Sequence, residues 1–419
     1  MKILFLVKFF RPFDRGGSEW STHDLAKSLA RRGHQITIVT PNYGAKSNDV
    51  LENIEIKRMP FPIKLKSPKS SISPFWTNNI IWYLASTIYC LNIIFRGKYE
   101  VIQIHNNEFL PAGVIASFFL KKPTVVTFRD YQSLCNLGFC LWKRNRVYSL
   151  KEYITKEFQF FYRNYVNNKN KTKYIILIIA ALRGFIMQKI LYFFARKASA
   201  KIAVSKKVAE IFAQNGIKNL KIIHNVVLIN NKPQNQSQEE ISYVGKLSKG
   251  KGLGIFFETI PQVLQKLPGV NISIIGSGHL DSYLKEFVKE KGIENRVKFE
   301  GQLAHDLVLK KIKNTSLSVV PSLWPEPLPR SIIETILSGT PVVATDVGGN
   351  SEIIKNNVYG IIVKPQVEDL QKGIISAYKN RNKLKKNIMR DLVSLRRHFA
   401  TETVDIYETT YFKLIENNR

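Results

Sequence analysis

Short apolar runs alternate with amphipathic stretches along the first half of the chain. The run 2–7 is followed by Pro, Asp and Gly, which are typical turn residues. Residues 19–32 carry apolar side chains at helical spacing, Gly33 ends that pattern, and 36–40 is apolar again. Further strand-like runs follow at 101–104, 124–128 and 201–204. Strands that alternate with helices predict a parallel sheet covered on both faces, and hence a Rossmann-like domain.

The same alternation restarts after a polar segment. Residues 229–240 are mostly polar and contain Pro, which is typical of a linker between domains. The strands expected beyond it are 241–244, 270–275, 296–299, 317–320 and 341–345, and the helices expected between them lie near 253–266, 279–290, 305–313 and 329–338. We therefore expect an α/β protein with two Rossmann-like, doubly wound domains that face a central cleft. The predicted boundaries are 1–228 and 241–395 for the domains, with a closing helix in 396–419 that returns to the first domain.

Length and composition agree with this organisation. The 419 residues are 44% hydrophobic and 23% charged, which is enough for two hydrophobic cores. The three cysteines, at 90, 135 and 140, make no disulfide framework and no metal-binding motif, as is usual in a reducing, cytosolic setting. The most apolar stretches, 80–95 and 174–182, are shorter than the roughly 20 residues that cross a bilayer, so no transmembrane helix is predicted.

Two glycine-containing loops follow first strands and precede helices. Gly16 and Gly17 would let the backbone approach a ligand at the positive end of the next helix, which favours an anion such as phosphate. The alternative is a plain loop with a helix cap at Ser18. The second loop, 245–252, reads GKLSKGKG and brings Lys246 and Lys251 to the same kind of position. Lysines that are merely solvated are the alternative there.

Two glutamates stand in a third constellation. Glu326 precedes a predicted helix and Glu334 lies inside it, a little over two turns further on, so both can point toward one end of the sheet. Carboxylates at that place can accept hydrogen bonds from sugar or ribose hydroxyls. The backbone N–H groups around 328–331 can bind phosphate. Two glutamates at this spacing also occur by chance, but here a Pro-rich loop precedes them and Gly-x-Pro-Val-Val follows.

In this order the motifs resemble a known family. Gly16-Gly17-x-Glu19, Gly245-Lys246 with Lys251-Gly252, Glu326-x7-Glu334 and Asp346-Val347-Gly348-Gly349-x-x-Glu352 occur as in the retaining glycosyltransferases of family 4, which have the two-domain GT-B fold. The likeness runs from residue 1 to about 365, and the tail 399–415 is similar to the closing helix of the family. The resemblance implies a nucleotide-sugar donor, a UDP- or GDP-sugar, with no further cofactor.

The resemblance also implies roles for single residues. Gly16 and Gly17 would face the donor diphosphate, and Lys246 and Lys251 would neutralise it, although the family usually has Arg at the first lysine. The other implied donor-binding residues are Glu326 for the transferred sugar, Glu334 for the ribose, Gln302 and Leu303 beside the base, and Leu328 and Pro329 near phosphate. The chain has no Asp-x-Asp motif, so no metal site is expected.

One position departs from the family pattern. Many relatives have His-Asp-Tyr where this chain has Arg129-Asp130-Tyr131. An arginine cannot act as a base near neutral pH, but Arg129 can stabilise negative charge on a leaving phosphate. The alternative is a structural ion pair with Asp130. His105, which follows the preceding strand, is the other catalytic candidate, against a capping role. A second departure is Asn225-Val226, where relatives commonly have Asn-Gly-Val.

The positive charge is concentrated in one segment. The formal net charge is +31, and residues 141–206 hold 15 Lys or Arg against two acids, Glu152 and Glu157, interleaved with aromatic and aliphatic residues. Such segments lie in the interface of anionic membranes. The alternative is a core helix over 174–195 with solvated lysines beside it. The first interpretation predicts a cytoplasmic protein held peripherally on the inner face of the membrane through 141–206.

Taken together, the sequence predicts a retaining, metal-independent hexosyltransferase. It would transfer sugar from a nucleotide-sugar donor to an envelope polysaccharide, such as lipopolysaccharide, or to a lipid-linked acceptor. The high positive charge leaves a nucleic-acid-binding protein as an alternative from another class, although the chain has no RNA-binding consensus or zinc finger. The replacement at Arg129 leaves a second alternative, a relative that binds donor but has lost activity.

Overall fold

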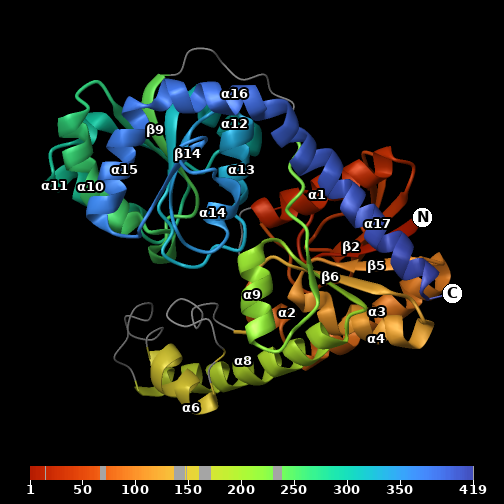
Figure 1. The fold of residues 1–419 in the computed structure, drawn as a ribbon. Helices are drawn as coiled ribbons and strands as arrows, with labels where there is room; N and C mark the ends of the chain where they lie inside the picture. Colours follow the sequence, from red (N-terminus) through yellow and green to blue (C-terminus); the bar gives the residue numbers. More distant parts are fainter. Residues whose placement is uncertain are drawn as a thin grey trace. The chain divides into compact units, whose positions relative to one another are not determined.

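The computed structural model describes residues 1–14, 16–66, 72–135, 147, 149–159, 171–229 and 238–418. They form two compact units, which are coloured along the chain in Figure 1. Unit 1 comprises Met1–Val226 and Thr403–Arg419, and unit 2 comprises Val227–Glu402. The first segment of unit 1 ends two residues before the predicted 228, and its last segment begins seven residues after the predicted 396. Most of the predicted linker, 230–237, lies outside the described residues.

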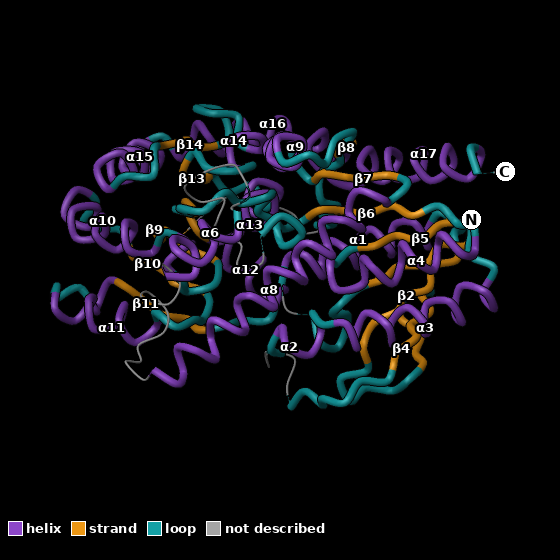
Figure 2. The backbone as a smooth tube through the Cα atoms, turned by 90° about the horizontal axis from the view of Figure 1, so that it is seen from below, coloured by secondary structure: helices purple, strands orange, loops and turns teal. Residues whose placement is uncertain are grey.

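Unit 1 is built on one mixed sheet whose strands are mostly parallel. Its strands are β1 (Lys2–Leu6), β2 (Gln35–Pro41), β3 (Asn48–Leu51), β4 (Ile54–Met59), β5 (Val101–Ile104), β6 (Thr124–Phe128), β7 (Ala200–Ala203) and β8 (Leu220–Ile222). They pair in the order β3-β4-β2-β1-β5-β6-β7-β8, and among these described strands only the β3–β4 pair is antiparallel. Figure 2 shows β5, β6 and β7 side by side. The residues of β5 and β6 are buried along their whole length, as expected for a sheet with helices on both faces.

The helices of unit 1 divide between the two faces of this sheet. They are α1 (Gly17–Arg31), α2 (Pro74–Thr77), α3 (Ile80–Gly97), η1 (Asn107–Phe109), α4 (Leu110–Leu120), α6 (Leu150–Glu152), η2 (Tyr153–Phe158), α8 (Lys171–Lys197), α9 (Lys206–Gln214) and α17 (Thr403–Glu416). Right-handed crossovers put α1 on one face, and α3, α4 and α8 on the other. In Figure 1 these three helices run along one side of the sheet.

Helix α17 is the last element of the chain, yet it packs within unit 1. The Tyr411 hydroxyl donates to Oε1 of Gln103 at 2.8 Å, and the hydroxyls of Tyr407 and Thr127 lie 3.3 Å apart. Arg32 at the end of α1 forms ion pairs with Asp405 and Glu408. Both tyrosines are fully buried. The C-terminal helix therefore completes the polar interior beside β5 and β6.

Unit 2 repeats the architecture with a smaller sheet. Its strands are β9 (Gln238–Val244), β10 (Asn271–Ile275), β11 (Val297–Gly301), β12 (Thr315–Val320), β13 (Val342–Thr345) and β14 (Gly360–Val363), which pair in parallel in the order β11-β10-β9-β12-β13-β14. The helices are η3 (Lys249–Lys251), α10 (Leu253–Lys266), α11 (Asp281–Glu290), η4 (Glu294–Arg296), α12 (His305–Asn314), α13 (Arg330–Leu337), α14 (Asn350–Ile353), α15 (Val367–Lys379), α16 (Arg381–Arg397) and η5 (His398–Glu402).

The core of unit 2 lies between this sheet and helices α10 and α15. Phe256, Phe257 and Ile260 of α10 are buried against Ile272 and Leu317 of the sheet, together with Leu370 and Ile374 of α15. Burial of these side chains removes a large apolar area from water and is the main favourable term in folding. Both units thus have the doubly wound arrangement, and the predicted fold class is confirmed.

Three local expectations change. The prediction did not identify the β3–β4 hairpin or strand β14, which are short and partly polar. Helices α3 and α8 are longer than the apolar runs that predicted them, and both reach the length and hydropathy of a membrane span, with 33% and 22% of their apolar windows buried. Helix α8 covers the expected stretch 174–195 and buries one side, including Met187 and Leu191, while Ile179 and Ile186 on another side are exposed. Cys90 is a buried free thiol, while Cys135 is disulfide-bonded.

The structure predicts that Gly252 cannot be replaced, although its neighbour Gly254 can. Gly252 has φ +73°, and an added Cβ would lie 1.7 Å from the carbonyl oxygen of Pro321. Gly252→Ala should lower the free energy of unfolding by about 2 kcal/mol or more, which shifts the melting temperature by about 4–8 °C.

The matched control is Gly254→Ala. A Cβ at Gly254, inside helix α10, would have nothing within 4 Å, and alanine favours a helix over glycine by up to about 1 kcal/mol. Thermal unfolding of both variants checks the prediction. A Gly252→Ala protein that melts as high as the wild type would contradict it.

Candidate functional site

In unit 2, the predicted motifs gather where strands β9, β10, β12 and β13 end. Each strand is followed by a loop: 245–252, 276–280, 321–329 and 346–349. Parallel strands place their carboxyl ends at one edge of the sheet, which is where such folds bind ligands. We call these four loops the carboxyl edge of unit 2. Sequence-distant motifs therefore come together for a topological reason.

The backbones of these loops pack directly against one another. The N–H groups of Gly245 and Leu247 donate to the carbonyls of Ile275 and Ser277, both at 3.0 Å. Gly276 has φ +145°, and a Cβ there would lie 1.9 Å from the oxygen of Gly245. The carbonyl of Gly250 accepts from the N–H groups of Leu323 and Trp324. Glycine is required where the first two loops meet. The loop 245–252, which we call the lysine loop, is held by hydrogen bonds to the loops 276–280 and 321–329.

Glu326 is held by the lysine loop. Its Oε1 atom lies 2.5 Å from Nζ of Lys251 and accepts a hydrogen bond from the Ser322 hydroxyl at 2.8 Å. The residue is only 4% exposed. Its carbonyl oxygen accepts from the N–H of Gly349, and a Cβ on Gly348 would lie 2.1 Å from the same oxygen. Two predicted donor-binding residues, Lys251 and Glu326, are thus brought into an ion pair.

Glu334 has a different pair of partners. Nε of Arg330 and Nε2 of His305 lie 2.6 and 2.7 Å from its Oε1. Burial alone would raise the pKa of Glu334, but the Arg330 guanidinium and the His305 imidazole outweigh burial and hold this pKa below its usual value. The carboxylate is therefore ionised and fixed in direction at neutral pH. Sequence reasoning gave no role to His305 or Arg330.

The other donor-binding candidates lie around these carboxylates. Lys246 is in the lysine loop, and its carbonyl accepts from the Tyr243 hydroxyl at 2.9 Å. Burial, together with the charges of Lys246 and Lys249, lowers the pKa of His279 in the neighbouring loop. Four candidates remain. Gln302 and Leu303 directly follow β11, and Leu303 packs against Ile275 and Val308. Leu328 is buried, and Pro329 lies at the start of α13.

In unit 1, Gly16 and Gly17 form the start of helix α1. Gly16 is the residue before the helix and no side chain caps it, while Gly17 is the first helical residue. The alternative of a cap at Ser18 is therefore wrong, because Ser18 lies inside the helix, where its carbonyl accepts from the Thr22 hydroxyl. A Cβ on Gly16 would meet only the far end of Glu19, at 4.0 Å. Space is therefore open beside the first turn.

Arg129 lies at the end of β6 and joins segments from across unit 1. Its Nε donates to the side chain of Asn225 at 3.0 Å, and its Nη1 donates to the Thr22 hydroxyl at 2.6 Å and to Nδ1 of His105 at 2.8 Å. The hydrogen bonds described for Asp130 come from Asn107 and from the backbone N–H of Gln132. The geometry thus places Arg129 against His105 and α1, and it does not support the alternative of an ion pair with Asp130.

The hydrogen bond from Arg129 determines the protonation of His105. A guanidinium can only donate, so Nδ1 of His105 accepts and the ring proton is on Nε2. Burial and the Arg129 charge hold the pKa of His105 well below its usual value. The ring is 3% exposed, packs against Phe5 with centroids 4.8 Å apart, and Nε2 has no hydrogen-bond partner within the described part of the chain. His105 is therefore a buried neutral donor and not a base or a helix cap.

A second cluster of polar residues follows the ends of β1, β5 and β6, and it includes Asn106, which is next to His105 in the sequence. Lys8 and Glu108 form a salt bridge of 2.5 Å, and the Lys8 N–H donates to the side chain of Asn106. Burial raises the pKa of Asp130 to about 6, with the nearby Glu108 charge adding to the effect. Asp130 therefore takes up a proton in mildly acidic solution. None of Lys8, Asn106 or Glu108 was a sequence candidate.

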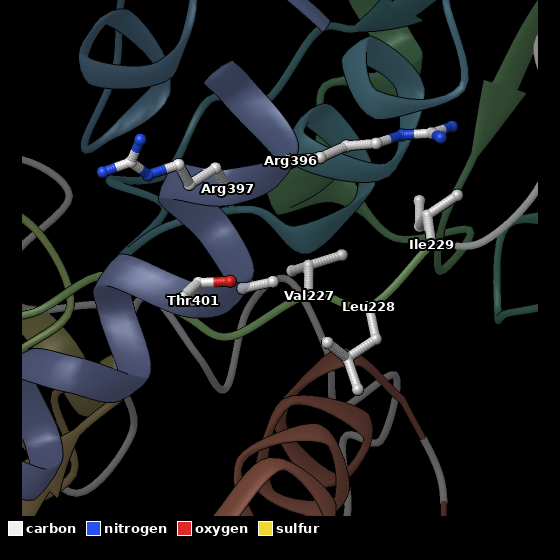
Figure 3. A pocket seen from close by; sticks show the side chains of 7 residues that line it. Val227, Leu228, Ile229, Arg396, Arg397 and Thr401 are labelled. Atoms are coloured by element: carbon white, nitrogen blue, oxygen red, sulfur yellow. The ribbon is translucent and has the colours of Figure 1, made fainter. Parts of the chain in front are cut away.

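Among its described residues, unit 2 also contains a cavity. It has a volume of about 380 Å³ and is lined in unit 2 by 227–229 and by Arg396, Arg397, Ala400 and Thr401 (Figure 3). No predicted site residue lines it. Separately, the described residues contain no group of three or more His, Cys, Asp or Glu side chains arranged to hold a metal ion.

Comparison with known proteins agrees with this geometry. The model of Glycosyltransferase Family 4 matches residues 15–230, and that of Glycosyl transferases group 1 matches residues 227–390. An uncharacterised glycosyltransferase of Methanocaldococcus jannaschii is 23% identical over 420 residues, which cover 97% of this chain and 98% of that protein.

Solved structures share the fold along the whole chain. The Anabaena protein HepE, in complex with UDP and glucose, is similar with a TM-score of 0.67 and 20% identity, covering 98% of this chain and 99% of that one. WaaG, a glycosyltransferase involved in lipopolysaccharide biosynthesis, is similar with a TM-score of 0.64 and 15% identity, covering 96% and 99%. The family models span both units, so this chain belongs to the family 4 glycosyltransferases and is a glycosyltransferase of the GT-B type.

Proposed function

We propose that the protein is a retaining hexosyltransferase that uses a UDP- or GDP-sugar and acts on an envelope polysaccharide or a lipid-linked acceptor in the cytoplasm. The observation that carries the proposal is the pair of fixed, buried carboxylates Glu326 and Glu334 beside the lysine loop 245–252. Family membership favours an enzyme over the nucleic-acid-binding alternative. In support of the donor class, HepE has been solved with UDP and with UDP-glucose. WaaG supports the class of acceptor.

The carboxyl edge of unit 2 has the groups that such a donor needs. Glu334 is ionised and oriented by Arg330 and His305, so it can accept from vicinal ribose hydroxyls. Lys246 and Lys251 are positive charges on a fixed loop, where they would neutralise a diphosphate. Lys251 is paired with Glu326. Arrival of a diphosphate would give Lys251 a second anionic partner and leave Glu326 able to accept from a sugar hydroxyl.

The proposed reaction uses the leaving group as base. The acceptor hydroxyl oxygen bonds to the anomeric carbon on the face from which the donor's phosphate oxygen departs. The anomeric carbon–oxygen bond to phosphate breaks, and the acceptor proton passes to that phosphate oxygen. No protein base is required, which is consistent with the neutral, donating state of His105 and with the permanent charge of Arg129. We propose that the Nε2–H of His105 donates to substrate, that Arg129 stabilises negative charge, and that Arg129 keeps the histidine in this tautomer.

Donor binding predicts a specific pattern of thermal shifts. A nucleotide sugar at about 100 times its dissociation constant stabilises a protein by ~2.7 kcal/mol, or about 5–10 °C for a domain of this size. One of a panel of UDP-, GDP- and ADP-sugars should give that shift. Lys246→Ala should weaken binding about tenfold because it removes a charge-assisted contact, whereas Lys246→Arg should preserve binding.

The control is Lys266→Ala, at the opposite end of helix α10 from the lysine loop. Its melting temperature should rise with the donor by as much as that of the wild type. Each variant is compared with its own ligand-free melting temperature, because loss of a lysine can also change stability. Absence of a shift with all donors would refute the proposed donor site.

Measurements of kcat/KM should distinguish the role of His105 from that of Arg129. His105→Phe removes the Nε2–H and should lower kcat/KM by about 100-fold, whereas His105→Gln, which keeps an N–H near that position, should lose less. Arg129→Ala should also lower kcat/KM. Because the pKa of His105 is held well below its usual value, titration of His105 should not contribute to the wild-type pH–rate profile between pH 6.5 and 8. If Arg129→Ala leaves turnover unchanged while His105→Phe abolishes it, the role given to Arg129 is wrong.

The lysine loop also predicts the response to metal removal. Since Lys246 and Lys251 would provide the charge that a divalent cation provides elsewhere, kcat/KM should change less than twofold after treatment with EDTA. Addition of Mg²⁺ or Mn²⁺ to the treated enzyme is the matched measurement. Loss of activity with EDTA that is restored by either ion would contradict metal independence.

A further inference from the structure

Helix α3 exposes an apolar stripe along its outer side. Ile81, Leu84, Ile88 and Phe95 are between 61% and 81% exposed. At 100° per residue they fall within one narrow sector of the helix, opposite buried Trp82, Tyr83 and Cys90. A solvent-facing helix normally has polar residues in that sector, as α11 does with Lys285, Glu286 and Glu290. The outer side of α3 therefore has the composition of a surface that contacts an apolar partner rather than water.

The neighbouring helices continue the apolar stripe. Helix α4 contacts both α3 and α8, and all three cover the same face of the unit 1 sheet (Figure 1). Phe118 and Phe119 at the end of α4 are 79% and 68% exposed. On α8, Ile179, Ile186 and Phe193 are more than half exposed and share one helical sector. Since the sheet lies behind these helices, their exposed sides point away from it. We call this surface the outer face of the α3–α4–α8 layer.

The charge of this layer has a single sign. The sequences of α3, α4 and α8 contain no Asp or Glu. Cations lie at the ends of the apolar stripes and among them: Arg96 and Lys98 after Phe95, Lys121 after Phe119, and Lys189 and Lys197 on the exposed side of α8. A protein partner is expected to meet a rim of mixed charge, whereas a phospholipid surface presents phosphate groups around an apolar interior.

The fold excludes one way of using these helices. Helix α3 is long and apolar enough to span a bilayer, yet it connects β4 to β5, which belong to one sheet. Both of its ends are therefore held at the sheet, and its inner side is buried against unit 1. Only the outer half of the helix is available, so it can lie along a membrane surface and not cross it.

We propose that the outer face of the α3–α4–α8 layer docks on an anionic lipid bilayer. The exposed isoleucine and phenylalanine side chains enter the interfacial region, and the lysines and arginines beside them contact lipid phosphates. The sequence predicted membrane contact through 141–206 alone, whereas this surface includes α3 and the end of α4, which lie outside that segment. The inference is independent of the donor and the reaction proposed above.

Vesicle flotation of the full chain tests the inference. The protein should float with vesicles of phosphatidylcholine and phosphatidylglycerol, and it should remain mostly in the soluble fraction with phosphatidylcholine alone. The triple variant Ile81→Gln, Ile88→Gln, Phe95→Gln should have an affinity for the anionic vesicles that is lower by about tenfold or more, because three apolar side chains are lost from the interface. Glutamine favours a helix well, so α3 should persist.

Matched controls separate this surface from general effects. Val393→Gln replaces a residue that is 82% exposed on α16 of unit 2, against 81% for Ile81, and should float as the wild type does. Lys189→Glu with Lys197→Glu should weaken binding at low salt, whereas Lys386→Glu on α16 should have a smaller effect. Melting temperatures and donor-induced shifts of the variants should match the wild type, which distinguishes failed docking from failed folding or failed donor binding.

Three outcomes would overturn the proposal. The first is a wild-type protein that stays soluble with anionic vesicles, and the second is a triple variant that binds them equally well. The third is a concentration-dependent dimer, seen by light scattering, that the triple variant loses while the wild type shows no vesicle binding. That last result would assign the outer face to a second copy of the chain.

Discussion

Parallel strand pairing is the constraint on which the rest of this structure depends. In a parallel sheet all carboxyl ends lie at one edge, so loops that are distant in sequence are forced together. In unit 2 this brings Lys251 to Glu326, 75 residues further on. In unit 1 it brings His105 after β5 to Arg129 after β6. The chemistry of each edge then follows from which side chains the strands deliver there.

The carboxyl edges of the two sheets stabilise buried charge in different ways. In unit 2, each carboxylate has a cation within hydrogen-bonding distance: Lys251 for Glu326, and Arg330 for Glu334. Such pairs keep the carboxylates ionised inside the protein, where an unpaired charge would be costly. In unit 1, the permanent cation Arg129 is beside a neutral imidazole instead. The hydrogen bond from Arg129 puts the ring proton on Nε2, and burial together with the Arg129 charge holds the pKa of His105 well below its usual value.

The sequence was informative where backbone chemistry frames a residue. Gly252 and Gly348 are fixed by close backbone contacts, and prolines surround Glu326, so these three loops of unit 2 were recognisable as motifs. The loop that begins at Gly276, which is fixed in the same way, was not recognised. The partners of Glu334 were harder to find. Arg330 is four residues away on the same helix, a spacing that could have been used, whereas His305 is 29 residues away with no local signal. Thr22 looked like an ordinary helix residue, and Asn225 was noticed only because a glycine is missing beside it.

The apolar helices show the same limit of sequence reasoning. The run 80–95 was recognised as apolar, but a linear sequence does not show which side of α3 faces the sheet. Burial separates Trp82 and Cys90 from Ile81 and Ile88, which alternate in the same run. Only the three-dimensional arrangement of α3, α4 and α8 turns three apolar segments into one surface.

The central claim is that the lysine loop and the two glutamates of unit 2 form the donor site. A crystal structure of the protein with bound UDP tests this most directly. The account predicts that the ribose hydroxyls contact Glu334, that the diphosphate lies beside Lys246 and Lys251, and that Nζ of Lys251 moves from Glu326 toward phosphate. A nucleotide bound elsewhere, for example in the cavity lined by 227–229 and Arg396, would contradict the account.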